Sequence, residues 1–197
     1  MLHVVKGFDR QFSDVLELAF KFRHEAFVEE AGWENLRRAD GREIDQFDTD
    51  DTIHVIAMKD GLVQAYSRLN PTIKPHVLSE VYPQLASRGL LREPGAWEWS
   101  RMGTAKHARN DGRGWSGPIG LLFRCISVVA LKENIDTLVW QAHPVWITRA
   151  SELGFDPEPM GLPLRIAGDR VVAAKMAVTE TVLKHMDAAH VPMVEYA

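Results

Sequence analysis

Acidic side chains crowd one short stretch of this chain, residues 40–51. Its six acids are Asp40, Glu43, Asp45, Asp48, Asp50 and Asp51, and Arg42 is the one base among them. Asp45 and Asp48 are spaced by three and flank the aromatic Phe47. Two interpretations stay open, a solvated acidic loop or a negatively charged site for a cation. The calcium-loop pattern, with its central Gly and terminal Glu, is absent.

An arginine and two aromatic residues precede the acidic stretch. Arg23 and Phe27 are four apart, so they share one face of a helix, and Trp33 follows in a loop. One interpretation is an aromatic core with an arginine at its rim. The other is an aromatic wall beside a guanidinium that binds a carboxylate.

A run of tryptophans and charges, 97–101, reads WEWSR. Strand alternation would point Trp97, Trp99 and Arg101 to one side, and Glu98 and Ser100 to the other. Charges on both sides of a strand need partners. Glu98, beside bulky apolar surface, is a candidate general base; the alternative is an ion pair at a strand end.

A glycine-bearing loop separates an expected strand from an expected long helix. Its spacing, Arg109-x-x-Gly112-x-Gly114, matches the pyrophosphate loop of acetyltransferase-type acyl-CoA binders. Backbone N–H groups at such a helix start can hold an anion. The chain has no nucleophile elbow, Walker loop or dinucleotide fingerprint. Its eight histidines lack ligand spacing, so no metal is expected.

Alternating strands and helices must position these residues. Strands are expected at 2–6, 52–59, 62–69, 97–104, 136–142 and 170–178, and helices at 12–29, 79–85, 116–133 and 179–188. A further helix is expected to follow Pro144 and to end at Gly154-Phe155. Asp60-Gly61 predicts a hairpin turn, because both turn positions need positive φ. The pattern predicts a mixed sheet flanked by helices, an α/β fold.

Length and composition indicate one globular domain, 1–197, because hydrophobic residues are 46% and charged residues 25% of the 197. The net charge of −4 argues against a nucleic-acid partner. The single cysteine, Cys125, excludes an internal disulfide and a cysteine-based zinc site, and it fits a reducing compartment. No membrane span or secretory signal is found, so a cytoplasmic location is expected.

Together these residues resemble the acyl-homoserine lactone synthases, the autoinducer synthase family of bacterial quorum sensing. The match is Arg23-x-x-x-Phe27, Trp33, Asp45-x-x-Asp48, Arg68 and Glu98-x-x-Arg101, in the family's order and spacing. The stretches RHEAFVEEAGW and GREIDQFD are typical of it. The resemblance covers about residues 2–161. The chain departs from the pattern at 102–104, where the family usually continues with aromatic or apolar residues, and its tail after Pro163 is short.

The resemblance implies an acetyltransferase-like (GNAT-type) fold, with a mostly antiparallel sheet. It implies that S-adenosylmethionine and an acyl thioester are converted to an N-acyl homoserine lactone and methylthioadenosine, without a cofactor. The implied S-adenosylmethionine-binding residues are Arg23, Phe27, Trp33, Asp45, Asp48, Arg68 and Arg101. The implied catalytic residues are Glu98, Asp45, Asp48 and Arg101.

The acyl donor and the acyl pocket are less constrained by the motif. The expected pocket residues are Met102, Gly103, Thr104, Trp140, Ala142 and Trp146. Tryptophan walls suit a short branched or aryl group, and the sequence looks closest to the branch that uses acyl-CoA. Its phosphates would lie on Arg109, Gly112 and Gly114; acyl carrier protein is the other donor. Two further functions stay open: N-acylation of another amine, which leaves the Arg23–Trp33 and Asp45–Asp48 set unexplained, and a non-catalytic acyl-ligand sensor.

Overall fold

The computed structural model describes residues 1–109 and 114–193, and it divides the chain into two compact units. Unit 1 comprises Met1–Arg68, Arg101–Ile126 and His190–Ala197; unit 2 comprises Leu69–Ser100 and Ser127–Ala189. Strands β3 (Leu62–Pro71) and β4 (Ala96–Thr104) and helix α3 (Pro118–Lys132) each contribute residues to both units.

The sheet of unit 1 has the order β1-β2-β3-β4. Strand β1 (Leu2–Lys6) pairs antiparallel with β2 (Ile53–Lys59), with Val4 opposite Val55. The turn between β2 and β3 confirms the predicted hairpin, since φ is 52° at Asp60 and 76° at Gly61. Both values lie in the left-handed region that a two-residue hairpin turn requires.

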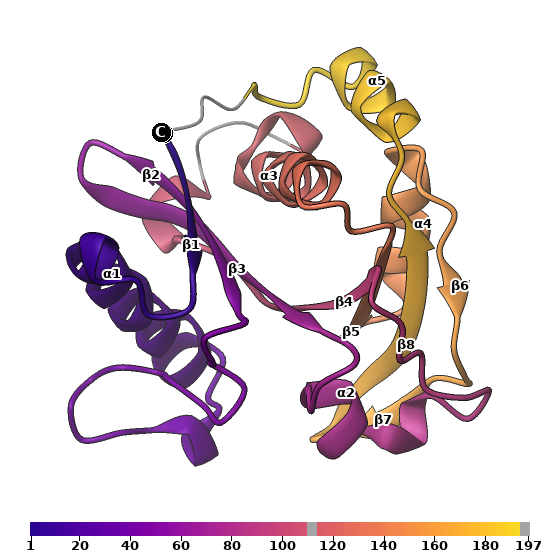
Figure 1. Cartoon of the computed structure of the whole chain (residues 1–197), viewed down its shortest axis with the longest axis horizontal. Helices are drawn as coiled ribbons and strands as arrows, with labels where there is room; N and C mark the ends of the chain where they lie inside the picture. Colours follow the sequence, from indigo (N-terminus) through magenta and orange to yellow (C-terminus); the bar gives the residue numbers. More distant parts are fainter. Residues whose placement is uncertain (110–113, 194–197) are drawn as a thin grey trace. The chain divides into compact units, whose positions relative to one another are not determined.

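Helix α1 (Ser13–Arg23) covers one face of this sheet (Figure 1). Apolar residues three and four apart form its buried stripe. The core that results consists of Val5, Leu16, Ala19, Phe20, Phe22, Ile56, Val63, Tyr66, Ala105 and Ala108. Arg23, the last residue of α1, is also fully buried, so the packing of the stripe fixes where its guanidinium lies.

The helix continues past α1 as a π-helix, His24–Glu30. The extent of the predicted helix 12–29 is confirmed, but its geometry changes between Arg23 and Phe27. After the π-helix the backbone folds back, and the Trp33 N–H donates to the Phe27 carbonyl at 2.9 Å. Short π-helical segments are rare and often occur at functional sites.

The strands of unit 2 have the order β3-β4-β5-β8-β6. Strand β5 (Thr137–Ala142) runs parallel to β4 and antiparallel to β8 (Asp169–Ala177). Two short strands, β6 (Glu158–Pro159) and β7 (Leu164–Ile166), pair antiparallel with β8. The expected mixed, mostly antiparallel sheet is confirmed, whereas β6 and β7 are additions to the predicted strands.

The helices of unit 2 are α2 (Val77–Glu80), α4 (Val145–Glu152), α5 (Glu180–Ala188) and the end of α3. The helix predicted at 79–85 is instead α2 followed by a 3-10 turn, Pro83–Leu85, because Pro83 has no N–H to continue the helical ladder. The core of this unit consists of Leu78, Leu85, Ala86, Val139, Met160 and Ala173.

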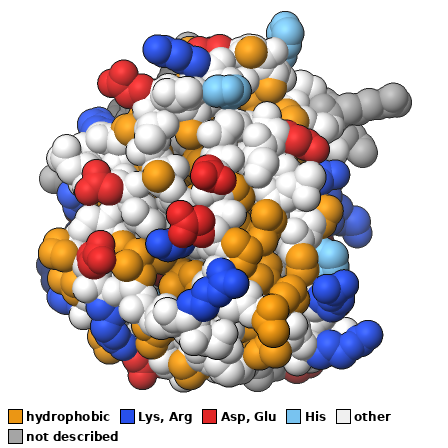
Figure 2. Space-filling model, turned by 90° about the vertical axis from the view of Figure 1, so that its right-hand side faces the viewer, with side chains coloured by type: hydrophobic (Ala, Val, Ile, Leu, Met, Phe, Trp, Pro, Cys, Tyr) orange, Lys and Arg blue, Asp and Glu red, His pale blue; other side chains and the backbone are white. Residues whose placement is uncertain are grey.

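Figure 2 shows the face of the molecule on which α4 and α5 lie, and acidic and basic side chains are interspersed there. Within residues 1–109 and 114–193, no helix has the length and apolar character needed to cross a bilayer.

Candidate functional site

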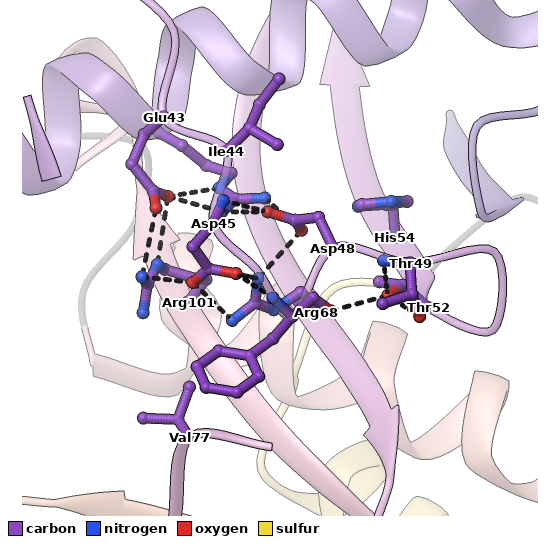
Figure 3. A network of polar contacts seen from close by, with 12 residues as sticks. Glu43, Ile44, Asp45, Asp48, Thr49, Thr52, His54, Arg68, Val77 and Arg101 are labelled. Atoms are coloured by element: carbon purple, nitrogen blue, oxygen red, sulfur yellow. Dashed lines mark hydrogen bonds and ion pairs between the residues drawn. The ribbon is translucent and has the colours of Figure 1, made fainter. Parts of the chain in front are cut away.

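Six charged side chains of unit 1 form one polar network (Figure 3). Its members are Arg23, Glu43, Asp45, Asp48, Arg68 and Arg101. They come from the end of α1, the loop that follows it, β3, and β4. Three guanidinium groups thus meet three carboxylates, and the network as a whole is neutral when all six are ionised.

Arg23 lies at the centre of the network with a fully buried side chain. Its Nη1 and Nη2 donate to the two carboxylate oxygens of Asp48 at 2.8 and 2.9 Å. Its Nε donates to Glu43 at 2.6 Å, and Nη1 also donates to the Tyr66 hydroxyl at 3.2 Å. Every guanidinium nitrogen of Arg23 therefore has a partner inside unit 1, and the direct substrate contact predicted for this residue remains a prediction.

Arg68 and Arg101 hold Asp45 between them. Arg68 Nη1 and Nη2 donate to the Asp45 carboxylate at 2.6 and 3.1 Å, and Arg68 also lies 2.9 Å from Asp48. Arg101 Nη2 donates to Asp45 at 2.7 Å, and Arg101 Nε donates to Glu43 at 3.1 Å. The side chains of Arg101 and Asp45 are 9% and 7% exposed, whereas that of Arg68 is fully buried, so the network is accessible only at this end.

An aromatic pair adjoins that accessible end. The rings of Phe27 and Trp33 stack at 5.3 Å with an interplanar angle of 15°, and Trp33 is 45% exposed. The Arg101 guanidinium lies 5.8 and 5.7 Å from the centres of these two rings. A Cβ on Gly103 would approach the Phe27 ring at 3.3 Å, so the missing side chain leaves space for the stack.

Arg101 has an unusual backbone conformation for a strand residue, with φ at 53°. L side chains rarely adopt this left-handed region, and the cost is about 1–3 kcal/mol. The simple alternation predicted along 97–101 therefore ends at Ser100. Non-glycine residues held in this conformation cluster at functional sites, where surrounding contacts stabilise them.

Local hydrogen bonds shape the acidic loop. The Asp48 carboxylate accepts the Asp45 N–H at 2.8 Å, and the Asp45 carboxylate accepts the Phe47 N–H at 2.9 Å. The Glu43 N–H donates to the Phe20 carbonyl at 3.0 Å and ties the loop to α1. Asp45 and Asp48 therefore order the loop, and together with Glu43 they face arginines instead of solvent.

Opposite charges control the ionisation of the network. Burial alone would raise the pKa of Asp48, but the Arg23 and Arg68 guanidinium groups outweigh burial and hold that pKa well below its usual range. Burial likewise opposes the ionisation of Asp45, and the Arg68 and Arg101 charges lower its pKa overall. Both acids are therefore carboxylates at neutral pH.

A buried histidine and tyrosine extend the network inward. His54 Nδ1 lies 2.7 Å from the Tyr66 hydroxyl, which accepts from Arg23. Burial lowers the pKa of His54 to about 4, so its imidazole is neutral. Burial also raises the pKa of Tyr66 to about 12.

Glu98 lies in unit 2, where its carboxylate is fully buried. It accepts the Leu78 N–H at 2.6 Å and the Val77 N–H at 3.1 Å, both at the start of α2. His76 Nδ1 lies 3.2 Å from it, and Gln141 Nε2 donates at 3.3 Å. Glu98 is therefore held by donors and is not part of a surface ion pair.

Strand register places the predicted acyl-binding residues of β5. Glu98 is opposite Val139, and Trp99 is opposite Trp140. Neighbours in register share a side of the sheet, so Trp140 lies on the side of Trp99, and Gln141 lies on the side of Glu98. Trp140 is 4% exposed.

The other predicted acyl-binding residues fall in both units. Ala142 and Trp146 are half-buried in unit 2, and Met102, Gly103 and Thr104 are half-buried in unit 1. Their contact with an acyl group remains a prediction.

The predicted phosphate loop lies partly beyond the described residues, since Gly112 falls in 110–113. Arg109 is 48% exposed and its Nη2 donates to Glu30 at 2.6 Å and to the Thr104 carbonyl at 3.1 Å. Gly114, with φ at 57°, begins a 3-10 turn. In the described part of the chain, no group of three or more His, Cys, Asp or Glu residues is placed to hold a metal ion.

Sequence reasoning missed five side chains that complete these two clusters: Glu43, His54, Tyr66, His76 and Gln141. Glu43 carried a signal, because it lies in the acidic stretch two residues before Asp45. The other four meet the motif residues only through strand pairing and the approach of α2, which no local spacing reveals.

The fold is one that N-acyltransferases also have. Two solved structures share it, a putative N-acetyltransferase from Lactobacillus plantarum and an acyl-CoA N-acyltransferase from Pseudomonas aeruginosa, with TM-scores of 0.57 and 0.58 at 20% and 19% identity. They cover 90% and 91% of this chain, and it covers 99% of each. At such identities the likeness shows the fold alone.

Residues 8–120 match the model of the autoinducer synthase family. The chain is 36% identical over 186 residues to an isovaleryl-homoserine lactone synthase of Bradyrhizobium diazoefficiens, covering 93% of this chain and 82% of the relative. An acyl-homoserine-lactone synthase of Ralstonia nicotianae is 41% identical over 160 residues, covering 78% and 76%.

A solved structure of the CoA-dependent acyl-homoserine lactone synthase BjaI, with SAM and isopentyl-CoA, has a TM-score of 0.88 at 35% identity, covering 98% of this chain and 90% of that one. The chain belongs to the autoinducer synthase family.

Proposed function

We propose that this protein is an acyl-homoserine lactone synthase. It transfers an acyl group from acyl-CoA to the amine of S-adenosylmethionine and then closes the lactone, with release of methylthioadenosine. The observation that carries the proposal is the neutral network of three arginines and three carboxylates whose accessible end adjoins the Phe27–Trp33 stack. This constellation occurs in a chain that belongs to the autoinducer synthase family.

The accessible end of the network suits the charges of S-adenosylmethionine. The exposed part of the Trp33 ring offers an aromatic surface for a sulfonium or an adenine. Arg101 and Asp45 present one positive and one negative group for the carboxylate and the ammonium. Arg23, Arg68 and Asp48 lie behind them and fix their positions, which is the support that a preorganised site needs.

The first chemical step joins the amine to the acyl group. The amine nitrogen attacks the thioester carbonyl, the carbon–sulfur bond breaks, and coenzyme A leaves as the thiol. A proton must leave the nitrogen, and Glu98 assists its removal directly or through an intervening group. General-base assistance contributes roughly 10²–10⁴-fold to rate.

The second step closes the ring. A carboxylate oxygen attacks the γ-carbon, and the bond from that carbon to the sulfonium sulfur breaks to release neutral methylthioadenosine. Opposite charges disappear in this step, so a site shielded from water favours it. A folded methionyl chain brings the two reacting atoms together and supplies an entropic advantage.

We propose a short branched or aryl acyl-CoA as donor. The support is the bulk of Trp140 and Trp146, and the similarity to a relative named for isovaleryl-homoserine lactone. Long acyl chains on acyl carrier protein are the competing donors. The proposal places the reaction in the cytoplasm.

The test supplies purified protein with S-adenosylmethionine and, in parallel, isovaleryl-CoA, an aryl-CoA and a long acyl carrier protein thioester. We expect methylthioadenosine and the lactone from the first two donors, detected by mass spectrometry. An N-acyl product without methylthioadenosine would instead indicate acylation of another amine. Glu98→Gln should lower turnover with little change in S-adenosylmethionine binding, while Glu180→Gln, at an exposed glutamate, serves as control.

A further inference from the structure

A histidine lies directly against Glu98 inside unit 2. His76 is 1% exposed, and its Nδ1 is 3.2 Å from Glu98 Oε1. Its other ring nitrogen, Nε2, is buried and has no hydrogen-bond partner among the described residues. Burial of a polar atom without a partner is energetically unfavourable. Such an atom calls for a functional or ligand-related explanation.

The contacts of Nδ1 indicate which ring nitrogen carries the proton. The Glu98 carboxylate only accepts, so the 3.2 Å contact is favourable when Nδ1 carries the hydrogen. The Ser79 N–H is the competing partner of Nδ1, but it is farther, at 3.4 Å. With the hydrogen on Nδ1, the lone pair of the neutral imidazole lies on Nε2.

The hydrogen bonds of Glu98 suit an orienting group better than a direct base. Its Oε1 is shared by the Leu78 N–H, His76 and Gln141, and its Oε2 accepts the Val77 N–H. A proton taken up by this carboxylate would weaken these bonds, because hydrogen bonds to an ionised acceptor are stronger than those to a neutral one. His76 Nε2 has no such bond to lose.

We propose that His76 Nε2 is the group that takes the proton from the substrate amine, with Glu98 as the positioning residue that holds the imidazole and stabilises its protonated form. This inference rests on the proposed function and names the intervening group in its first step. The Glu98 carboxylate then acts through His76, in the arrangement of a base oriented by a third group.

The amine nitrogen forms its bond to the thioester carbonyl carbon, and its proton passes to Nε2 with the nitrogen–hydrogen bonding pair left on nitrogen. The imidazolium is then paired with the Glu98 carboxylate through Nδ1. Collapse of the tetrahedral adduct breaks the carbon–sulfur bond, Nε2 returns the proton to the departing thiolate, and neutral imidazole is restored.

His76 also occupies the N-cap of α2, so the test must separate capping from proton transfer. The backbone half of the capping box, His76 N–H to Ser79 Oγ at 3.0 Å, survives any side-chain change. Asparagine is among the best N-cap residues, but its amide does not accept a proton at neutral pH. His76→Asn therefore provides a side chain that can cap α2 and removes the base.

The experiment measures kcat and KM of wild type and His76→Asn with S-adenosylmethionine and isovaleryl-CoA from pH 5 to 9. Glu98 is the charged group that faces the imidazole from β4, and Glu80 lies behind Ser79 on α2 itself. We expect kcat to fall at least 100-fold, KM for S-adenosylmethionine to stay within about 3-fold, and the acid limb of the kcat profile to disappear. Glu98→Gln should lower kcat and shift the acid limb of the kcat profile to a different pH.

His76→Gln is the second variant, and thermal melting accompanies every measurement. If either variant keeps kcat within 3-fold of wild type with the same acid limb, the inference is overturned while lactone formation by the wild type leaves the proposed function intact. If both variants lose their melting transition, His76 is a folding residue and the inference is also overturned. A wild-type protein that makes no lactone from any donor overturns both proposals.

Discussion

Arg23 and Asp48 form a bidentate ion pair in which both side chains are fully buried, with nitrogen–oxygen distances of 2.8 and 2.9 Å. Arg23 is the last residue of α1, and Asp48 lies in the loop 25 residues later. The pair fixes the loop against the helix. Asp45, which lies at the accessible end of the same network, is thereby held in place.

The first prediction concerns this pair. Asp48→Asn removes a negative charge from beside the fully buried guanidinium groups of Arg23 and Arg68. Removing one partner of a buried ion pair costs about 3–5 kcal/mol. We expect the free energy of unfolding in urea to fall by that amount. Asp50→Asn, at an exposed acid of the same loop, should change it by less than about 0.5 kcal/mol. Equal effects of the two changes would contradict a buried network.

The second prediction concerns pH. Folding lowers the pKa of His54 from 6.5 to about 4, chiefly through burial. Between these values the unfolded chain binds a proton that the folded chain does not, so stability falls as pH drops from 6.5 to 4, by about 3 kcal/mol. The lowered pKa of Asp45 and Asp48 adds a further loss only below about pH 4.

His54→Phe tests the assignment, because the new ring can pack between Phe8 and Phe20, whose rings lie near the imidazole. Urea unfolding of this variant should vary with pH between 6.5 and 4 much less than that of the wild type, with a small slope left by His3, whose pKa burial also lowers. His107→Gln, at an exposed histidine, should keep the wild-type slope. A wild-type slope in His54→Phe would assign the proton uptake to another group.

The third prediction concerns the stack of Phe27 and Trp33. Trp33→Ala removes the exposed aromatic surface and its contact with Arg101, so KM for S-adenosylmethionine should rise about 10-fold, with KM for acyl-CoA unchanged. Trp33→Phe keeps an aromatic ring, so its KM for S-adenosylmethionine should rise less than that of Trp33→Ala. Initial-rate kinetics with each substrate varied provide the measurement, and a change confined to acyl-CoA would place Trp33 at the other substrate.

The fourth prediction concerns Arg109. Its ion pair with Glu30 is solvent-exposed and weak, so a diphosphate can replace it at little cost. Arg109→Gln should raise KM for acyl-CoA about 3–10-fold in low salt, and the difference should shrink in high salt because salt screens exposed charges. Arg38→Gln, also exposed, is the control. Identical KM values for both variants would remove Arg109 from the donor site.

Much of the fold could be predicted because local rules govern it. The Asp60-Gly61 turn, the strand 2–6 and the apolar stripe of α1 all follow from residue type and spacing. The strands β6 and β7 could not, because two or three residues carry no alternation. The change from α- to π-helix after Arg23 could not be predicted either, because apolar spacings of three and four do not distinguish these helices.

The candidate site was likewise predictable only in part. One network contains five of the motif residues, as a common motif suggests: Arg23, Asp45, Asp48, Arg68 and Arg101. That the arginines neutralise the acids could not be predicted from the sequence. Neither interpretation of the acidic stretch, as a solvated loop or as a negatively charged site, included the arginine partners that β3 and β4 supply. His76 and Gln141 approach Glu98 from 22 and 43 residues away, and only the folded chain brings them together.

Unit 1 draws its residues from three separate stretches of the chain, and the middle one ends at Ile126. During synthesis, Arg101 leaves the ribosome well after Glu43 and Asp45, its partners in the network. Until β4 emerges, Glu43 and Asp45 therefore each lack one of their two arginine partners, while Arg23 and Arg68 are already available. A fragment that stops before residue 101 should lack the accessible end of the network, and neither unit can be cut out of the gene as one continuous piece.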